Sequence, residues 1–402
     1  MNAEKLRNDF AVLWHRIKGK PIIYRDSACQ SLRPRLVVDK MSQYYNEYSA
    51  CGGRSQHKLG KRVDEEVAKA REITRKFLNA RSADEIVFTK NATEGINLVA
   101  NSLGLQKGDV VITTDKEHNS NLIPWQMLAQ NKGIVHEIVE FGNVESLRVA
   151  LKAAGKKAKL VSMVHISNLD GTSIPANEII KIAHDNNALV MLDGAQSAPH
   201  KQIDLKKLNA DFFVCSGHKM LGPSGTGILY GKQALLEKLS PFIVGGDTVV
   251  ESTYKTAEFE KAPAKFEAGL QNYAGIVGLG EALSYLARIG MGEIEERDCF
   301  LNKKITDAIG DIDGLHLLGP KDAKQRGSIF SFDLSGMNPN EVAMMLDESA
   351  NVMVRSGAHC CHSWFNAHKM QGSVRASTYL YNTEDDIRIF IEEVRKMAKF
   401  LR

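Results

Sequence analysis

Short apolar runs alternate with amphipathic stretches between about residues 64 and 230. Most gaps between the runs have the apolar spacing of a helix, such as ANEIIKIAHDNN at 176–187. Apolar strands separated by helices are typical of a largely parallel sheet that is covered on both faces. The pattern therefore predicts an α/β fold with a mostly parallel, seven-stranded sheet. The candidate strands are EIVFT (85–89), VVITT (110–114), GIVHEIVE (133–140), LVSMVHI (160–166), LVMLD (189–193), DFFVCS (211–216) and GILYG (227–231).

The pattern changes after residue 231. A loop-rich stretch at 241–269 leads into a long helical pattern, NYAGIVGLGEALSYLARIG, at 272–290. Beyond it, a helical pattern precedes strands such as SIFSFDL at 328–334, and two more helical patterns cover 338–349 and 383–402. This arrangement predicts a smaller α+β domain after the sheet domain.

Three segments are expected along the 402 residues, because a chain of this length exceeds one small core. Residues 1–20 are predicted to be a helical segment that packs with the small domain. Residues 21–285 are predicted to form the large domain. Residues 286–402 are predicted to form the small domain, which carries the loop VRSGAHCCHSWFN.

Composition and charge narrow the class of protein. The chain is 43% hydrophobic and 25% charged, with a net charge of +4, which is ordinary for a globular protein. Basic residues do not cluster with aromatic ones, so nucleic acid is not an expected partner. No run approaches the roughly 18 apolar residues of a membrane span, and the N-terminus lacks the apolar core of a signal peptide. We therefore expect a cytoplasmic protein without membrane contact.

The six cysteines do not have the spacing of a disulfide framework. Four of them are interpreted as ordinary thiols, namely Cys29, Cys51, Cys215 and Cys299. The other two are adjacent and lie between two histidines, in the loop that the small domain carries.

Polar residues follow several predicted strands, at the edge where an open parallel sheet binds its ligands. After the first strand, Asn91 or Thr93 can cap a helix whose first N–H groups suit an anion. A plain capped helix explains the same residues. His118 follows the second strand, where a structural histidine is the simpler interpretation. Asn168 and Asp170 follow the fourth strand before a glycine, as turn residues commonly do.

The residues at the ends of the next two strands indicate a more specific chemistry. Asp193 follows four apolar residues, so its charge needs a cation nearby. Lys219 follows a buried strand, where it either reaches solvent or is held in a site as a nucleophilic amine. A strand-end Asp, this Lys, an anion-binding helix start and a nearby His together predict a pyridoxal phosphate site. Lys219 forms the Schiff base, Asp193 pairs with the pyridine nitrogen, and Ser216 and His218 help to bind the phosphate.

Several motifs extend this prediction over nearly the whole chain, from RDSACQ (25–30) to YLYNTEDD (379–386). With them the chain resembles the class V, fold-type I pyridoxal phosphate enzymes, and more narrowly the Suf-type cysteine desulfurases and selenocysteine lyases. Each motif alone is weak evidence, whereas all of them in order are specific. The motifs are NATEGINLVANSLG, EH-x-x-N-x-x-PW, DGAQS, SGHK and RSGAHC.

The resemblance implies a role for each matching residue. Lys219 matches the lysine that carries the cofactor and moves the Cα proton, and His118 matches the histidine that stacks on the ring. Arg355, Arg375 and Asn168 match residues around the substrate. The cofactor-binding residues that it implies are Lys219, Ala92, Thr93, His118, Asn168, Asp193, Gln196, Ser216 and His218.

Cys360 falls on the family's sulfur-accepting cysteine. The implied reaction converts L-cysteine, or L-selenocysteine, to L-alanine and leaves the sulfur on Cys360 as a persulfide. Only the thiolate is nucleophilic, and His359, Arg355 or the substrate can favour its formation. The resemblance also implies a homodimer and a sulfur-acceptor or scaffold protein of iron–sulfur cluster assembly.

Three departures from the family pattern concern the site. Ala358 stands where the family has the first histidine of a pair, and Cys361-His362 follows where it often has alanine. Leu270 stands where the family has a threonine that binds the phosphate across the subunit interface. A leucine cannot donate that hydrogen bond, which predicts weaker cofactor binding or a substitute group.

Other interpretations of the paired cysteines remain open. Residues His359 to His362 are all metal-ligand types, but four consecutive residues do not easily surround one tetrahedral ion, so no metal is predicted. A strained disulfide between Cys360 and Cys361 is a second interpretation, and a packed Cys361 is the plainest.

Two other functions also remain open. A class V aminotransferase, epimerase or lyase would need Lys219 and not Cys360. A non-catalytic sulfur or metal carrier would need neither the cofactor nor its lysine.

Overall fold

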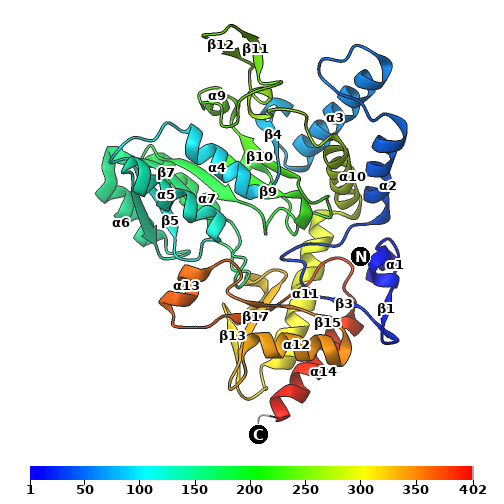
Figure 1. Ribbon diagram of the computed structural model, residues 1–402. Helices are drawn as coiled ribbons and strands as arrows, with labels where there is room; N and C mark the ends of the chain where they lie inside the picture. The colour runs from blue at the N-terminus through cyan, green and yellow to red at the C-terminus, as the bar shows by residue number, and fades with distance from the viewer. Residues whose placement is uncertain (401–402) are drawn as a thin grey trace.

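A seven-stranded sheet forms the centre of the larger part of the computed structural model, which describes residues 1–400 (Figure 1). Its strand order is β4-β10-β9-β8-β7-β5-β6. Strands β5 to β9 run parallel, and β10 is antiparallel to both of its neighbours. This confirms the predicted α/β fold and its mostly parallel sheet. The strands are β4 (Ile86–Thr89), β5 (Val110–Thr114), β6 (Val135–Val139), β7 (Ala158–Val164), β8 (Leu189–Asp193), β9 (Phe212–Ser216) and β10 (Gly227–Gly231).

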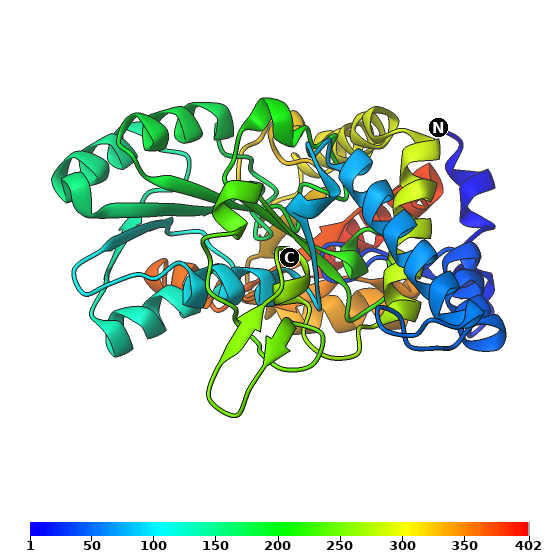
Figure 2. The ribbon, with the colours of Figure 1, turned by 90° about the horizontal axis from the view of Figure 1, so that it is seen from above.

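Helices cover both faces of the sheet, as Figure 2 shows from above. Successive side chains of a strand point to opposite faces. In β9, Phe213 packs in one apolar core, and Phe212 and Val214 pack in the other. No helix of the described residues is long and apolar enough to cross a membrane. The helices of this part are α2 (Arg35–Glu47), α3 (Lys58–Phe77), α4 (Ala92–Ser102), α5 (Ile123–Lys132), α6 (Val144–Ala154), α7 (Ala176–Asp185), α8 (Leu205–Leu208), α9 (Gln233–Leu236) and α10 (Tyr273–Ile289).

A second, antiparallel sheet of four strands belongs to the C-terminal part of the described chain. Its order is β13-β14-β17-β16, and it packs with three helices around an apolar core of its own. The elements of this part are α11 (Met291–Ile309), β13 (Leu315–Leu318), β14 (Ile329–Leu334), α12 (Pro339–Ala350), β15 (Val352–Met353), β16 (Arg355–Gly357), α13 (His362–Ala367), β17 (Ser373–Ser377) and α14 (Glu384–Phe400). The predicted helix at 383–402 thus extends to residue 400, and residues 401–402 lie outside the described residues. The boundary predicted at residue 285 falls inside α10, which continues to Gly290 before α11 begins.

The N-terminal segment is not the continuous helix that its sequence predicts. Helix α1 (Ala3–Arg7) ends at Asn8, a short 3-10 turn covers Ala11–Trp14, and a hairpin of β1 (Arg16–Ile17) and β2 (Lys20–Pro21) follows. The hairpin forms because Lys18 and Gly19 adopt positive φ angles in its turn. The amide of Asn351 donates to carbonyls of this hairpin, which ties it to the C-terminal part.

The chain then passes between the two parts of the molecule. Strand β3 (Ile23–Tyr24) pairs with β15 in parallel, and residues 25–31 continue toward the large sheet. Ser31 N–H donates to the carbonyl of His218 at 2.9 Å, and the amide of Gln196 donates to the carbonyl of Ala28 at 2.7 Å. This N-terminal loop therefore closes over the carboxyl ends of β8 and β9.

Gly194, directly after β8, packs against the ring of Phe213. A Cβ at Gly194 would meet the ring of Phe213 at 1.9 Å. We expect Gly194→Ala to lower the free energy of unfolding by about 1–3 kcal/mol, because the ring has no space to move in a packed core. Urea unfolding followed by circular dichroism measures the change. Gly292→Ala is the matched control, since nothing lies within 4 Å of that Cβ in a helix; equal losses in both variants would contradict the prediction.

Candidate active site

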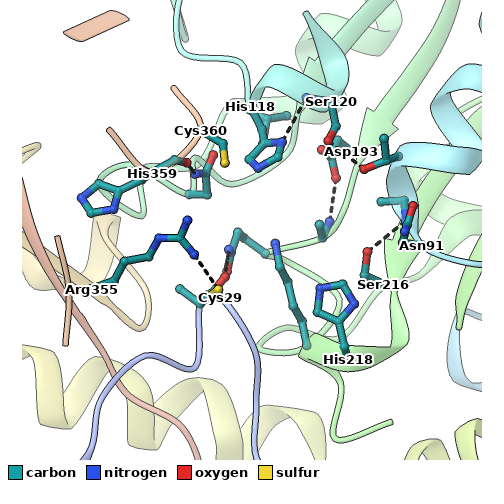
Figure 3. A pocket seen from close by; sticks show the side chains of 18 of the residues that line it. Cys29, Asn91, His118, Ser120, Asp193, Ser216, His218, Arg355, His359 and Cys360 are labelled. Atoms are coloured by element: carbon teal, nitrogen blue, oxygen red, sulfur yellow. Dashed lines mark hydrogen bonds between the residues drawn. The ribbon is translucent and has the colours of Figure 1, made fainter. Parts of the chain in front are cut away.

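A cavity of about 250 Å³ opens at the carboxyl ends of the parallel strands, beneath the C-terminal part of the chain (Figure 3). Every site residue that the sequence predicts lines it. The predicted residues among its lining are Ala92, Thr93, His118, Asn168, Asp193, Gln196, Ser216, His218, Lys219, Arg355, Cys360 and Arg375. Segments from both sheets and from the N-terminal loop thus meet at one point.

Asp193 and Gln196 lie together after β8. Asp193 is 3% exposed, and its Oδ1 accepts a hydrogen bond from the N–H of Ala195 at 2.9 Å. Burial raises the pKa of this carboxyl, and the positive charge of Lys219 opposes the rise. Gln196 leaves its buried Oε1 without a hydrogen-bond partner. The pair therefore presents an acceptor oxygen and a carboxylate that is stabilised by any cation that enters the cavity.

Lys219 ends a short turn, Gly217–Lys219, directly after β9. Its ammonium is enclosed by protein, although part of its surface faces the cavity. Burial lowers the pKa of Lys219 and outweighs the opposing effect of Asp193. A lowered pKa increases the fraction of neutral amine, which is the nucleophilic form. The turn requires glycine at 217, because a Cβ there would meet Thr226 Oγ1 at 2.2 Å.

The first turn of α4 forms the anion-binding end of the cavity. Asn91 caps the helix by accepting from the N–H of Glu94 at 2.9 Å, and the N–H of Ala92 donates to Ser216 Oγ at 2.9 Å. Thr93 and Ser120 join their hydroxyls at 2.7 Å. A helix N-terminus with hydroxyl groups beside it suits a phosphate. The first turn of α4 is therefore the part of the cavity where we expect the phosphate to bind.

His118 presents a neutral ring to the same cavity. Its Nδ1 accepts from the N–H of Ser120 at 3.0 Å, so the ring proton resides on Nε2. Burial, with the charge of Lys219 as a smaller cause, lowers the pKa of His118 to about 3. Burial likewise lowers the pKa of His218 to about 4. Both rings are uncharged at neutral pH, which favours stacking over ion pairing.

Glu117 anchors the segment that carries His118. Its role was not predicted from the sequence. Its carboxyl accepts from the hydroxyl of Thr114 at 2.6 Å, the amide of Asn121 at 2.7 Å and the N–H of Val164 at 2.8 Å. Burial raises its pKa to about 8. The EH-x-x-N motif carried the signal, since it contains both Glu117 and its hydrogen-bond donor Asn121.

Two arginines on neighbouring strands of the small sheet line the cavity. Arg355 of β16 lies opposite Arg375 of β17. Arg375 is 2% exposed; its Nη1 donates to the carbonyl of Asn168 at 2.8 Å, and its Nη2 lies 3.5 Å from Asp26 Oδ1. Its Nε has no partner. A guanidinium with unused donors beside a cavity suits a carboxylate.

Cys29 is a cavity residue that the sequence analysis interprets as an ordinary thiol. Arg355 Nη1 donates to Cys29 Sγ at 2.6 Å. The N-terminal loop carries Cys29 to this place, and nothing in the spacing between positions 29 and 355 predicts the contact. Asp26 was missed for the same reason.

Two hydrogen bonds hold the loop of Cys360 against the large domain, and a third closes a turn within the loop. Asn168 Nδ2 donates to the carbonyl of His359 at 2.7 Å, the N–H of Asn119 to the carbonyl of Cys360 at 2.7 Å, and the N–H of Cys361 to the carbonyl of Ala358 at 2.7 Å. His359 and Cys360 both have positive φ angles, of 49° and 59°. Non-glycine residues rarely adopt this conformation, so the surrounding contacts fix it.

The neighbours of Cys360 have different roles from one another. Cys361 is 1% exposed in an apolar cluster, its thiol lies 3.3 Å from Asn168 Oδ1, and burial raises its pKa to about 12. This matches the packed interpretation, and all six cysteines of the chain are free thiols. His359 bonds Ser373 Oγ at 2.9 Å, and burial lowers its pKa to about 2. Burial thus disfavours the charged form of the His359 ring.

Two further observations concern the remaining departures and alternatives. Leu270 is 70% exposed and lines a separate surface pocket with Lys90 and Glu94. Ala358 packs beside the apolar cluster of Cys361. In the described part of the chain, no three His, Cys, Asp or Glu side chains gather in a way that could hold a metal ion.

The residues of the cavity fit pyridoxal phosphate. The orphaned Gln196 Oε1 is an acceptor for a ring hydroxyl, and the buried Asp193 carboxylate suits a protonated ring nitrogen. Lys219 supplies the amine for the aldehyde, and the start of α4 with Ser216 supplies donors for the phosphate. These four demands are met by side chains that face one enclosed space.

Comparisons with known proteins agree with this site. Residues 23–390 match the family model described as aminotransferase class-V. A relative from Synechocystis sp., named probable cysteine desulfurase, is 40% identical over 99% of this chain and 96% of its own length. The apo structure of a cysteine desulfurase from Thermococcus onnurineus is 34% identical, covers 99% of this chain and 98% of its own, and superposes with a TM-score of 0.93.

A cysteine desulfurase structure from Escherichia coli is also similar, at 31% identity and a TM-score of 0.89, covering 100% of this chain and 99% of its own. Identity above 30% over the full length, together with the family model, is far beyond a shared fold alone. The chain belongs to the class-V aminotransferase family.

Proposed function

We propose that this protein is a cysteine desulfurase, a pyridoxal phosphate enzyme that converts L-cysteine to L-alanine and leaves the sulfur on Cys360. The observation that carries the proposal is the placement of Lys219, Asp193 and Cys360 around one cavity. The names of full-length relatives support the choice of substrate.

Bound to Lys219, the cofactor supplies an electron sink that makes the Cα proton of the substrate acidic. Asp193 keeps the ring nitrogen protonated, since a buried carboxylate is stabilised by that cation. The neutral ring of His118 lines the cavity and would help to hold the cofactor by stacking. Lys219 Nζ, once displaced by the substrate amine, is a neutral base beside Cα and takes the proton.

The arginines orient the substrate. The free Nε of Arg375 and the guanidinium of Arg355 attract the substrate carboxylate. The side chain of the substrate then faces Cys360, whose loop Asn168 and Asn119 hold in place. In the predicted step, the Cys360 thiolate attacks the substrate sulfur. An S–S bond forms, the Cβ–S bond breaks, and the electron pair goes to the carbon that becomes the methyl group of alanine.

The proposal extends to the surroundings of the enzyme. The family resemblance implies a homodimer and delivery of sulfur to an acceptor or scaffold protein of iron–sulfur cluster assembly. It also implies activity toward L-selenocysteine and a cytoplasmic location. Exposed apolar residues near Leu270 support the dimer, since Ile243, Val244 and Leu270 are 44%, 60% and 70% exposed.

Borohydride reduction tests the role of Lys219. We expect a pyridoxyl group on this lysine alone, because the other lysines lie outside the cavity. Trypsin does not cut at a modified lysine, so the peptide should extend from residue 208 to residue 232 in mass spectrometry. Lys219→Ala should abolish the adduct and reduce alanine formation by several orders of magnitude. An adduct on another lysine, or none, would contradict the assignment.

Replacement of Cys360 tests the sulfur transfer. We expect Cys360→Ala to lose persulfide and alanine formation and to keep the absorbance band of the cofactor, because the thiol accepts sulfur and does not bind the ring. Cys51→Ala, which removes an exposed thiol outside the cavity, is the control. Turnover of L-cysteine by Cys360→Ala at the control's rate would instead favour a lyase or aminotransferase that does not use this residue.

Static light scattering tests the dimer. We expect a mass of twice the 44.5 kDa of one chain, and we expect Leu270→Asp to shift the mass toward the single chain, because burying a carboxylate in an apolar interface is unfavourable. A wild-type mass equal to one chain would rule out the dimer.

A further inference from the structure

Cys29 is a second thiol on the wall of the active-site cavity (Figure 3). Its backbone is fixed, since its N–H donates to the carbonyl of Asp26 at 3.0 Å and the neighbouring carbonyl of Ala28 accepts from Gln196 at 2.7 Å. Its side chain is only half-buried, so the sulfur faces the cavity that Cys360 also lines. Two thiols from opposite ends of the sequence therefore share one enclosed space.

Two arginines share the cavity wall with Cys29. Arg355 Nη1 donates to Cys29 Sγ at 2.6 Å. Arg375 lines the same cavity, is 2% exposed and leaves Nε without a hydrogen-bond partner, so the wall holds an unused cationic donor. Lys219 lines this cavity together with Cys29 and Cys360, so one amine and both sulfurs share the same space. A thiolate or persulfide anion at either position is thus compensated by nearby cations.

The other cysteines do not share this environment. Cys361 is packed in an apolar cluster, 3.3 Å from Asn168 Oδ1, and its pKa is raised to about 12, so its thiolate is strongly disfavoured. Cys215 is fully buried in the sheet. Cys51 and Cys299 do not line the cavity. Of the chain's six thiols, Cys29 is therefore the one placed to exchange sulfur with Cys360.

We infer that Cys29 is a second sulfur acceptor, which takes the sulfur from Cys360 inside the cavity. This inference rests on the proposed function, because that activity supplies the persulfide. The Cys29 thiolate attacks the outer sulfur of the Cys360 persulfide. An S–S bond forms at Cys29 as the S–S bond at Cys360 breaks, and the electron pair returns to Cys360 as its thiolate. No oxidant or reductant is consumed, since one persulfide replaces another.

The transfer has two physical consequences. It frees Cys360 for a second substrate molecule while the first sulfur is still bound, so one chain stores two sulfur atoms. It also changes what Arg355 contacts, because a persulfide anion on Cys29 competes with the substrate carboxylate for the same guanidinium. Sulfur on Cys29 should therefore weaken substrate binding until an acceptor removes it.

Mass spectrometry of the holoenzyme tests the inference. The enzyme is mixed with a small molar excess of L-cysteine without reductant, quenched by alkylation and digested with trypsin. Cys29 lies in the peptide 26–35, Cys51 in 41–54, and Cys360 with Cys361 in 356–369, where fragmentation separates the two. We expect one added sulfur atom on Cys29 and one on Cys360, and none on the exposed Cys51, which reports transfer through solution.

Two variants fix the order of transfer. In Cys29→Ser we expect bound sulfur to fall from two atoms per chain to one, with Cys360 still modified. In Cys360→Ala we expect no sulfur on Cys29, because the relay has no donor. Sulfur on Cys360 with Cys29 unmodified in the wild type, or equal labelling of Cys29 and Cys51, would overturn the relay and leave the proposed function intact. Absence of sulfur on every cysteine, together with absence of alanine, would instead refute the proposed function.

Discussion

The burial of Lys219 opposite Asp193 is the constraint on which the rest of the site depends. A lysine enclosed by protein loses hydration, so its charged form is disfavoured and its amine becomes reactive. Asp193 is enclosed for the same reason and lacks a cation strong enough to offset its own desolvation. The amine and the carboxylate therefore face one space. A cationic aromatic ring bound between them would stabilise the buried carboxylate.

The two parts of the chain are joined by the groups that perform the chemistry. Arg375 of the small sheet donates to the carbonyl of Asn168, and the amide of Asn168 donates to the Cys360 loop. Asn168 thus orients an arginine for the substrate and the acceptor cysteine at once. The contact of Asn168 with the substrate region stays a prediction. The positive φ angles of His359 and Cys360 show how firmly the loop is held.

Neutral histidines are a common feature of the cavity. His118, His218 and His359 all have lowered pKa values, with burial as the main cause. The cationic side chains on the cavity wall are therefore the two arginines, with Lys219 as an amine whose charged form burial disfavours. In the proposed function, the arginines bind the substrate carboxylate and the neutral His118 ring stacks on the cofactor. Cys29 lies beside the charged Arg355, whereas Cys361 packs in an apolar cluster, so the two thiols have different environments.

The sheet, its covering helices and the residues that follow each strand could be predicted from local patterns in the sequence. Strand runs and helical spacing are local features, and the ends of parallel strands must meet at one edge, so Asp193, Lys219 and His118 could be placed together before any coordinates. Features that depend on segments distant in the chain could not be read from local patterns. The hairpin that follows α1 in the N-terminal segment is tied to the C-terminal part by Asn351, more than three hundred residues away, whose amide donates to its carbonyls. Cys29 meets Arg355, and His359 turns to Ser373, because the packing of the two sheets, and no local spacing, fixes which side chains share an enclosed space.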